Sequence, residues 1–222
     1  MQSFLEFFQT HRQYFDAAEA LNSIVSLVGW SLGAVLVAVA WRRNAIRHVT
    51  VGPFSFQMQE AVEATATAAR AWKVQVPDQK VDLDRIRATV GRAFVPEVAD
   101  HLIGKSVLWV DDNPANNELA VRALKKLHLN VEQVTSTEAA LMAMQYRPFD
   151  LVISDMGRGE NMRAGYELLK AIREKGSAVP FLIFAGSDTP EFRREAAALG
   201  AQLSTNDMLE LIQKVIAELG EG

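Results

Sequence analysis

Cysteine is absent from the 222 residues of this sequence, so disulfide bonds and thiolate metal sites are excluded. Positive charge is not in excess: 23 lysines and arginines stand against 27 aspartates and glutamates, and the net charge of −4 argues against general affinity for nucleic acid. The glycine-rich motifs that bind nucleotide phosphates are also missing. What is present is a mixed sequence, 49% hydrophobic, with enough apolar residues for a core.

Ionisable side chains are missing from residues 21–41. About 20 helical residues, at about 1.5 Å each, span a bilayer core of about 30 Å. Arg42, Arg43 and Arg47 follow directly, whereas the tail 1–20 is net acidic. The positive-inside rule places that tail outside and the remaining chain in the cytoplasm. We therefore predict a single-pass anchor in the inner (cytoplasmic) membrane, in preference to a signal peptide, which needs a basic start and a shorter apolar core, or a buried helix of a soluble domain.

Small residues recur within the predicted span. Gly29 and Gly33 form a G-x-x-x-G pair, and such spacing lets two helix backbones approach closely. Small residues are also common in membrane helices without any role in association. The pair is therefore a candidate for helix packing in a homo-oligomer, with ordinary composition as the alternative.

Residues 42–104 read as an α-rich connector between the span and the C-terminal part. Alternating apolar residues around Gly52-Pro53 predict a short hairpin or extended segment. Helices are expected over residues 57–76 and 82–94. The first carries a heptad-like apolar seam, which either forms a short coiled coil or packs on a neighbouring helix or on the C-terminal domain. The seam consists of Met58, Val62, Thr65, Ala69, Trp72 and Val76.

Acidic residues close the apolar runs in the C-terminal half. The run that starts at Ser106 ends in Asp111 and Asp112, and a second run ends in Asp155. Alternating strands and helices predict parallel βαβ units, whose ligands bind at the carboxyl ends of the strands. Three carboxylates meeting there need a cation or a retained proton, and Mg²⁺ suits such oxygen ligands. The alternative is that these acids cap the helices that follow.

These motifs resemble a response-regulator receiver domain over residues 105–222. The resemblance implies an α/β, flavodoxin-like, doubly wound five-stranded parallel sheet. It also implies that Asp155 accepts a phosphoryl group and that Asp111 and Asp112 hold Mg²⁺ together with Asp155. The backbone carbonyl of Gly157, two residues beyond the acceptor, would be a further metal ligand.

The sequence departs from the family pattern at three places. The hydroxyl residue expected after the fourth strand is replaced by Ala185, with Ser187 two residues later as a candidate substitute. No lysine occurs between Lys175 and Lys214, where the family has one after its fifth strand, and the aromatic residue of that strand is also missing. Arg158 or Arg163 could replace the lost cation at a phosphoryl group. Alternatively, both are solvated loop charges.

These features allow three functions. The leading hypothesis is a membrane-anchored signalling protein that is not an enzyme beyond self-phosphorylation from a donor. It would act through a sensor kinase, a downstream effector or self-assembly. The alternative is a phosphorylation-independent pseudo-receiver that serves as an oligomerisation or binding scaffold. A metal-dependent phosphatase or nucleotide-processing enzyme is disfavoured, because Asp111 and Asp112 are adjacent rather than spaced Asp-x-Asp.

Overall fold

The computed structural model describes residues 53–221, apart from residue 75 and residues 78–80. The predicted span 21–41, the tail 1–20 and the Gly29–Gly33 pair lie outside these residues. Within the described part, no helix is both long enough and apolar enough to cross a bilayer. The described residues form a single compact unit.

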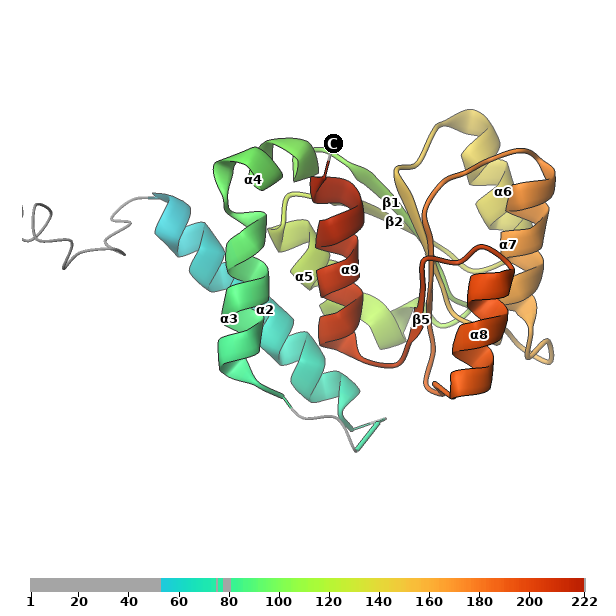
Figure 1. Ribbon diagram of the computed structural model, residues 1–222, viewed down its shortest axis with the longest axis horizontal. Coiled ribbons are helices and arrows are strands. Elements are labelled where there is room, and N and C mark those ends of the chain that lie inside the picture. Colours follow the sequence, from blue (N-terminus) through green and yellow to red (C-terminus); the bar gives the residue numbers. More distant parts are fainter. Residues whose placement is uncertain (1–52, 75, 78–80, 222) are drawn as a thin grey trace, which may run out of the picture. The chain divides into compact units, whose positions relative to one another are not determined.

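A five-stranded, fully parallel sheet forms the centre of the described part (Figure 1). Its strand order, β2-β1-β3-β4-β5, reverses direction next to β1, as in a doubly wound sheet. The predicted flavodoxin-like fold is therefore confirmed. The strands are β1 (Ser106–Val110), β2 (Asn130–Val134), β3 (Leu151–Ser154), β4 (Phe181–Phe184) and β5 (Leu203–Thr205).

Helices cover both faces of this sheet, as parallel strands require. The α6, α7 and α8 helices lie on one face, and the α5 and α9 helices lie on the other (Figure 1). Side chains of β1 alternate between two cores: Val107 and Trp109 point to the α5–α9 side, and Leu108 and Val110 point to the opposite side. The helices are α5 (Glu118–Lys126), α6 (Thr137–Tyr146), α7 (Ala164–Glu174), α8 (Pro190–Ala198) and α9 (Met208–Gly220), with a 3₁₀ turn, η1 (Pro114–Asn117), before α5.

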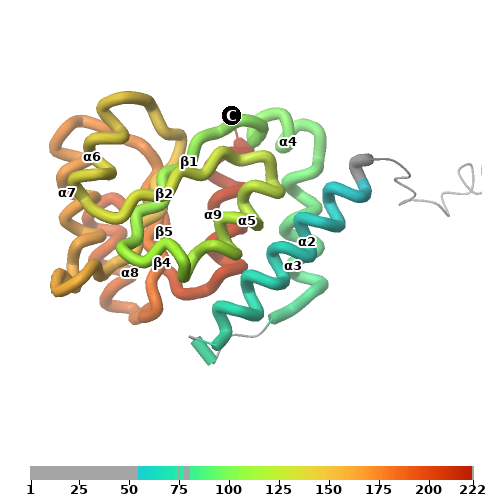
Figure 2. Tube along the Cα trace, turned by 180° about the vertical axis from the view of Figure 1, so that it is seen from behind, coloured from blue at the N-terminus to red at the C-terminus, as the bar shows by residue number. Residues whose placement is uncertain are grey.

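The connector adds a further layer of helices outside α5 and α9. It consists of α2 (Pro53–Trp72), α3 (Leu83–Ala93) and α4 (Pro96–Leu102). The α2 helix packs against α5, and α3 and α4 pack against α9 (Figure 2). Buried residues of α2 and α3 belong to the same apolar core as β1 and α9. The connector ends at residue 104 in the sequence. Its buried side chains nevertheless share one apolar core with the C-terminal half.

The seam of α2 packs on the sheet-bearing domain, which is one of the three arrangements expected from the sequence. Val62, Thr65, Ala69 and Trp72 are buried there. Burial removes apolar surface from water at about 25 cal/mol per Å², so this contact stabilises both the connector and the domain. The seam thus fixes α2 to the same body that carries the acidic residues.

One prediction for the connector is wrong. Residues 54–56 are helical rather than extended, because Pro53 begins α2. Proline is favoured in the first helical turn, where its missing N–H would have no partner in any case. Leu83 is 39% exposed, whereas Ile86 and Val90 of the same helix are buried. It is the first residue of α3, one turn before the face that contacts the core.

Candidate functional site

The three predicted carboxylates meet at one edge of the sheet. Strand pairing places Val110 beside Ser154, so Asp111 and Asp155 follow neighbouring strand ends. The backbone N–H of Asp155 donates to the carbonyl of Val110 at 2.9 Å, which fixes this register at the site itself. Asp111, Asp112 and Asp155 each offer an oxygen within 4.8 Å of the others. The predicted convergence is therefore confirmed.

Negative charge in this cluster is only partly compensated by the protein. Burial, together with the nearby charge of Asp111, raises the pKa of Asp155 to about 6. Burial likewise raises the pKa of Asp111, although the backbone N–H of Asn113 and the side-chain amide of Asn117 both donate to it. The ionised form of the cluster is thus disfavoured unless a cation joins it.

The donor set fits a hard divalent cation. All three side chains offer carboxylate oxygens, which Mg²⁺ prefers, and no thiolate is available to select a softer metal. Asp111 is buried, Asp155 is half-buried and Asp112 is exposed, so the cluster opens to water on one side. Mg²⁺ usually keeps several waters, and an open side accommodates them. The carbonyl of Gly157 as a fourth ligand stays a prediction.

The loop between β3 and α7 is held against the acid pair. Within it, the backbone groups of Arg158 and Asn161 exchange two hydrogen bonds, of 2.9 and 3.0 Å. Gly159, in this tight turn, has φ +56°, a conformation that favours glycine. Its N–H donates to Oδ2 of Asp112 at 2.7 Å. One carboxylate of the cluster therefore also orders the loop beside it.

Arg158 is buried beneath this loop rather than solvated. One terminal nitrogen donates to Ser154 Oγ at 2.7 Å and to the carbonyl of Asp155 at 3.0 Å. The other donates to Thr137 Oγ1 at 2.9 Å and to the carbonyl of Ala164 at 2.7 Å. The reading of Arg158 as a solvated loop charge is wrong, because its guanidinium joins β3, α6 and α7. Its positive charge faces the acid cluster from within and offsets part of the rise in the pKa of Asp155 that burial and the charge of Asp111 cause.

The remaining candidates for phosphate contact lie at the edge of the site. Arg163 is exposed and pairs with Glu195 of α8. Ser187 is exposed on the loop after β4, and Ala185, which precedes it, is buried. Contact of either arginine or of Ser187 with a phosphoryl group stays a prediction.

Three residues that the sequence did not single out also shape the site. Ser154 is fully buried and donates to the carbonyl of Asp155 at 2.8 Å. Asn117 is buried and donates to Asp111 at 2.6 Å. Gly165 lies so near the acceptor that a β-carbon there would stand 2.7 Å from the backbone oxygen of Asp155. In the sequence, the only signals for these roles are weak: Ser154 is a polar residue directly before Asp155, and Gly165 is a glycine near the start of a helix.

Comparison with known proteins agrees with this geometry. Residues 107–206 match the family model of the response regulator receiver domain. The sensor protein EvgS of Escherichia coli K12 is 31% identical over 98 residues, which are 44% of this chain and 8% of that protein. This chain thus covers a small part of the length of that curated relative.

Solved structures match about half of this chain over nearly their whole length. The chemotaxis response regulator CheY4 of Vibrio cholerae is 26% identical, with a TM-score of 0.46, over 52% of this chain and 98% of that one. A two-component response regulator from Clostridium difficile is 18% identical, with a TM-score of 0.48, over 53% of this chain and 97% of that one. The family match covers residues 107–206, and the similarity of this part of the chain to a response regulator receiver domain agrees with the parallel sheet and the three clustered carboxylates.

Proposed function

We propose that Asp155 accepts a phosphoryl group, with Mg²⁺ held by Asp111, Asp112 and Asp155 and by the carbonyl of Gly157. The observation that carries this proposal is the placement of three carboxylates within 4.8 Å of one another at the ends of β1 and β3. The donor is a phosphorylated partner protein, such as a sensor kinase, or a small phosphodonor. The domain then acts as a regulatory switch, not as an enzyme that turns over a substrate.

The chemistry requires Asp155 to be ionised. A carboxylate oxygen of Asp155 attacks phosphorus, and the bond from phosphorus to the donor atom breaks, with its electron pair leaving on the donor. The product is an acyl phosphate on Asp155. Mg²⁺, when bound, neutralises charge on the phosphoryl oxygens and on the carboxylates. Arg158 and the hydroxyl of Ser154 both donate to the carbonyl of Asp155 and hold the acceptor's backbone in place during attack.

The departures from the family pattern affect the stability of the phosphorylated product rather than the attack of Asp155 on phosphorus. Ala185 offers no hydroxyl to a phosphoryl oxygen, and no lysine lies between Lys175 and Lys214. Each missing donor removes stabilisation of the phosphorylated state. We therefore expect a shorter-lived acyl phosphate than a complete site would give, and a signal that depends on other contacts of the domain.

Phosphate incorporation from acetyl phosphate tests the proposal directly. The full chain is expected to incorporate phosphate in the presence of Mg²⁺, and the label is expected to disappear in Asp155→Asn. Asp84→Asn is the matched control, because the Asp84 side chain is 91% exposed on α3, in the connector. Equal labelling of the chain and of Asp155→Asn would refute the assignment.

A phosphorylation-independent scaffold is the second candidate function. It is favoured by Ala185 and by the hydrogen bonds that already hold Asp111 through Asn113 and Asn117. A Mg²⁺ titration followed by fluorescence discriminates the two, because Trp109 lies on β1, two residues before Asp111. A Mg²⁺-dependent change that Asp111→Asn weakens supports the metal site. The scaffold function is supported if the unchanged chain incorporates no phosphate and if Asp155→Asn oligomerises to the same extent as the unchanged chain.

We also propose that residues 21–41 anchor the protein in the inner membrane, with the N-terminus outside. The absence of cysteine makes this testable by single introduced thiols. Ser3→Cys is expected to react with an impermeant maleimide in intact spheroplasts, and Ser187→Cys only after lysis. Reaction of both before lysis, or recovery of the chain in the supernatant after lysis, would refute the anchor.

Self-association through the span is a separate proposal. It rests on the spacing of Gly29 and Gly33. Gly33→Leu is expected to lower dimer formation in a membrane two-hybrid assay, whereas Val35→Leu, which leaves the pair intact, is the control. An unchanged dimer signal in Gly33→Leu would refute a role for the pair.

A further inference from the structure

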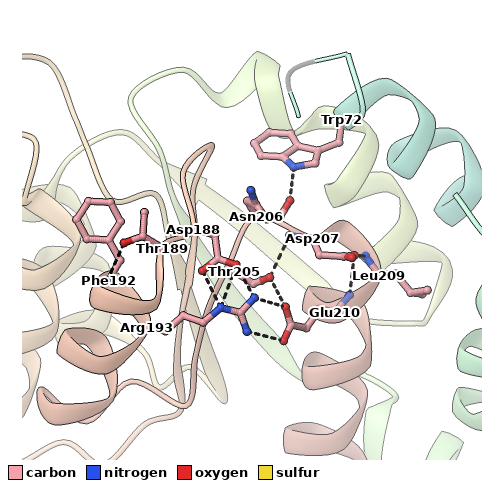
Figure 3. Close-up of polar contacts among 10 residues, drawn as sticks. All are labelled: Trp72, Asp188, Thr189, Phe192, Arg193, Thr205, Asn206, Asp207, Leu209 and Glu210. Carbon is pink, nitrogen blue, oxygen red and sulfur yellow. Dashed lines mark hydrogen bonds and ion pairs between the residues drawn. The ribbon is translucent and has the colours of Figure 1, made fainter. Parts of the chain in front are cut away.

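Trp72, the last residue of α2, inserts into the receiver domain (Figure 3). Its side chain is 7% exposed, and its ring centroid lies 4.4 Å from that of Phe184. Its indole Nε1–H donates to the carbonyl oxygen of Asn206 at 2.6 Å, across 134 positions of the sequence. A buried indole N–H needs a partner, so this bond determines where the end of α2 lies.

Both partners of Trp72 lie at carboxyl ends of strands, on the same edge of the parallel sheet as the acid cluster. Phe184 ends β4 and directly precedes Ala185, whereas Asn206 directly follows β5. Phe184 also makes an edge contact with Trp109, at 6.1 Å between ring centroids. Since Trp109 lies two residues before Asp111, the three rings form a row from the connector to the strand that carries the acid pair.

The loops after β4 and β5 are tied to each other by one arginine. Arg193, on α8, donates from Nε to Oδ1 of Asp188 at 2.8 Å and pairs with Oε2 of Glu210 at 3.1 Å (Figure 3). Thr205, the last residue of β5, donates its hydroxyl to the same Glu210 carboxylate. The start of α8, the end of β5 and the first turn of α9 are therefore linked through shared side chains. A displacement of one loop is expected to displace the other.

We propose that Trp72 is a positioning residue that couples these two loops to the connector helix α2. The fifth strand, Leu203-Ser204-Thr205, carries no aromatic side chain, and the ring next to β4 and β5 comes from α2 instead. A change of the loops moves Phe184 and the carbonyl of Asn206, and both contact Trp72. The change therefore reaches α2. Phosphorylation as the trigger rests on the proposed function, whereas the coupling itself does not.

Hydrogen–deuterium exchange of the purified full chain tests the coupling in two arms. The first arm compares Mg²⁺ alone with Mg²⁺ plus beryllofluoride, which imitates a bound phosphoryl group. In the unchanged chain, exchange is expected to change at residues 155–163 and in α2. In Trp72→Phe, which keeps a ring but removes the N–H, the change at residues 155–163 should persist and the change in α2 should fall at least twofold.

The second arm does not need a phosphoryl group. Glu210→Gln weakens the link among Arg193, Thr205 and Glu210. It is expected to speed exchange in the last turn of α2 severalfold when Trp72 is present, and to have little further effect in Trp72→Phe. Phe184→Leu, which removes the ring partner, should also uncouple the two sites. Ile86→Val, a buried change on α3, controls for general loss of stability.

The outcomes separate the coupling from the proposed function. Beryllofluoride that leaves residues 155–163 unchanged counts against phosphorylation, and the second arm then decides the coupling alone. The coupling is overturned if beryllofluoride binds but α2 responds equally with Trp72 and with Phe at that position. It is also overturned if Glu210→Gln affects α2 equally in both backgrounds.

Discussion

The backbone N–H of Gly159 donates a 2.7 Å hydrogen bond to Oδ2 of Asp112, across 47 positions of the sequence. This bond joins the end of β1 to the loop after β3. Asp112 thereby has two roles that can be separated: it accepts a hydrogen bond from the loop, and it contributes negative charge to the cluster. Asparagine retains an acceptor oxygen but not the charge, whereas alanine retains neither.

We expect Asp112→Asn to weaken Mg²⁺ binding while leaving the loop ordered. Asp112→Ala should weaken Mg²⁺ binding and also speed amide exchange at residues 157–163 severalfold, because the N–H of Gly159 loses its acceptor. Calorimetric titration with Mg²⁺ and peptide-resolved exchange measure the two effects. If both variants loosen the loop equally, the Gly159 bond does not order it.

Asp155 should destabilise the metal-free domain at neutral pH. Its pKa rises from the ordinary value of 3.8 to about 6, so the folded state binds this proton more tightly than the unfolded state does. The stability that the protonated form contributes is present below pH 4 and is lost as the pH rises through about 6. At pH 7, Asp155→Asn is expected to stabilise the apo protein by about 1–3 kcal/mol.

Denaturant unfolding from pH 4 to pH 8, compared between the unchanged chain and Asp155→Asn, measures this effect. The difference between the two unfolding free energies at each pH cancels the contributions of groups that both proteins share. Saturating Mg²⁺ should stabilise the unchanged chain more than the variant at pH 7. If the difference in unfolding free energy between the two proteins is constant from pH 4 to pH 8, the raised pKa of Asp155 is contradicted.

Gly165 should be intolerant of even a methyl group. A β-carbon there would lie 2.7 Å from the backbone oxygen of Asp155 and 3.1 Å from Cα of Met156. Gly165→Ala is therefore expected to displace the acceptor's backbone, to cost about 1–3 kcal/mol and to reduce phosphate incorporation. Gly91→Ala is the control: it lies in α3 with no atom within 4 Å of the added carbon, and should stabilise by about 0.5–1 kcal/mol.

Arg158 should contribute more to stability than any exposed arginine of the loop. Its guanidinium makes four hydrogen bonds, two of them to backbone carbonyls. Arg158→Met, which removes the donor of all four bonds, is expected to cost about 2–4 kcal/mol. Arg163→Ala removes an exposed ion pair with Glu195 and should cost less than about 1 kcal/mol. Equal losses of unfolding free energy would show that the four bonds add nothing.

Thr65 offers a stabilising substitution. It is fully buried in the seam of α2, and its hydroxyl has no hydrogen-bond partner among the described residues. Thr65→Val keeps the shape and removes the unpaired group, so we expect a gain of about 1 kcal/mol. Thr67→Val, at an exposed position whose hydroxyl already bonds to the carbonyl of Glu63, should change stability little. Thermal unfolding of the two variants distinguishes them.

The sequence by itself determined the parallel sheet, because apolar runs that alternate with helical spacing have few other ways to bury their residues. It also determined the cluster of acids, since Asp111, Asp112 and Asp155 follow strands whose carboxyl ends share one edge. Both inferences depend on local patterns that a chain displays before it folds. The seam of α2 was visible for the same reason.

The tertiary structure alone decided what surrounds these features. Whether the seam of α2 packs on another helix or on the domain depends on surfaces far away in the sequence, and so does the bond from Trp72 to Asn206. Arg158 shows no sequence sign that distinguishes it from a solvated loop arginine, because its four acceptors come from three separate elements. Contacts of this kind arise from the three-dimensional convergence of distant segments, and local periodicity carries no record of them.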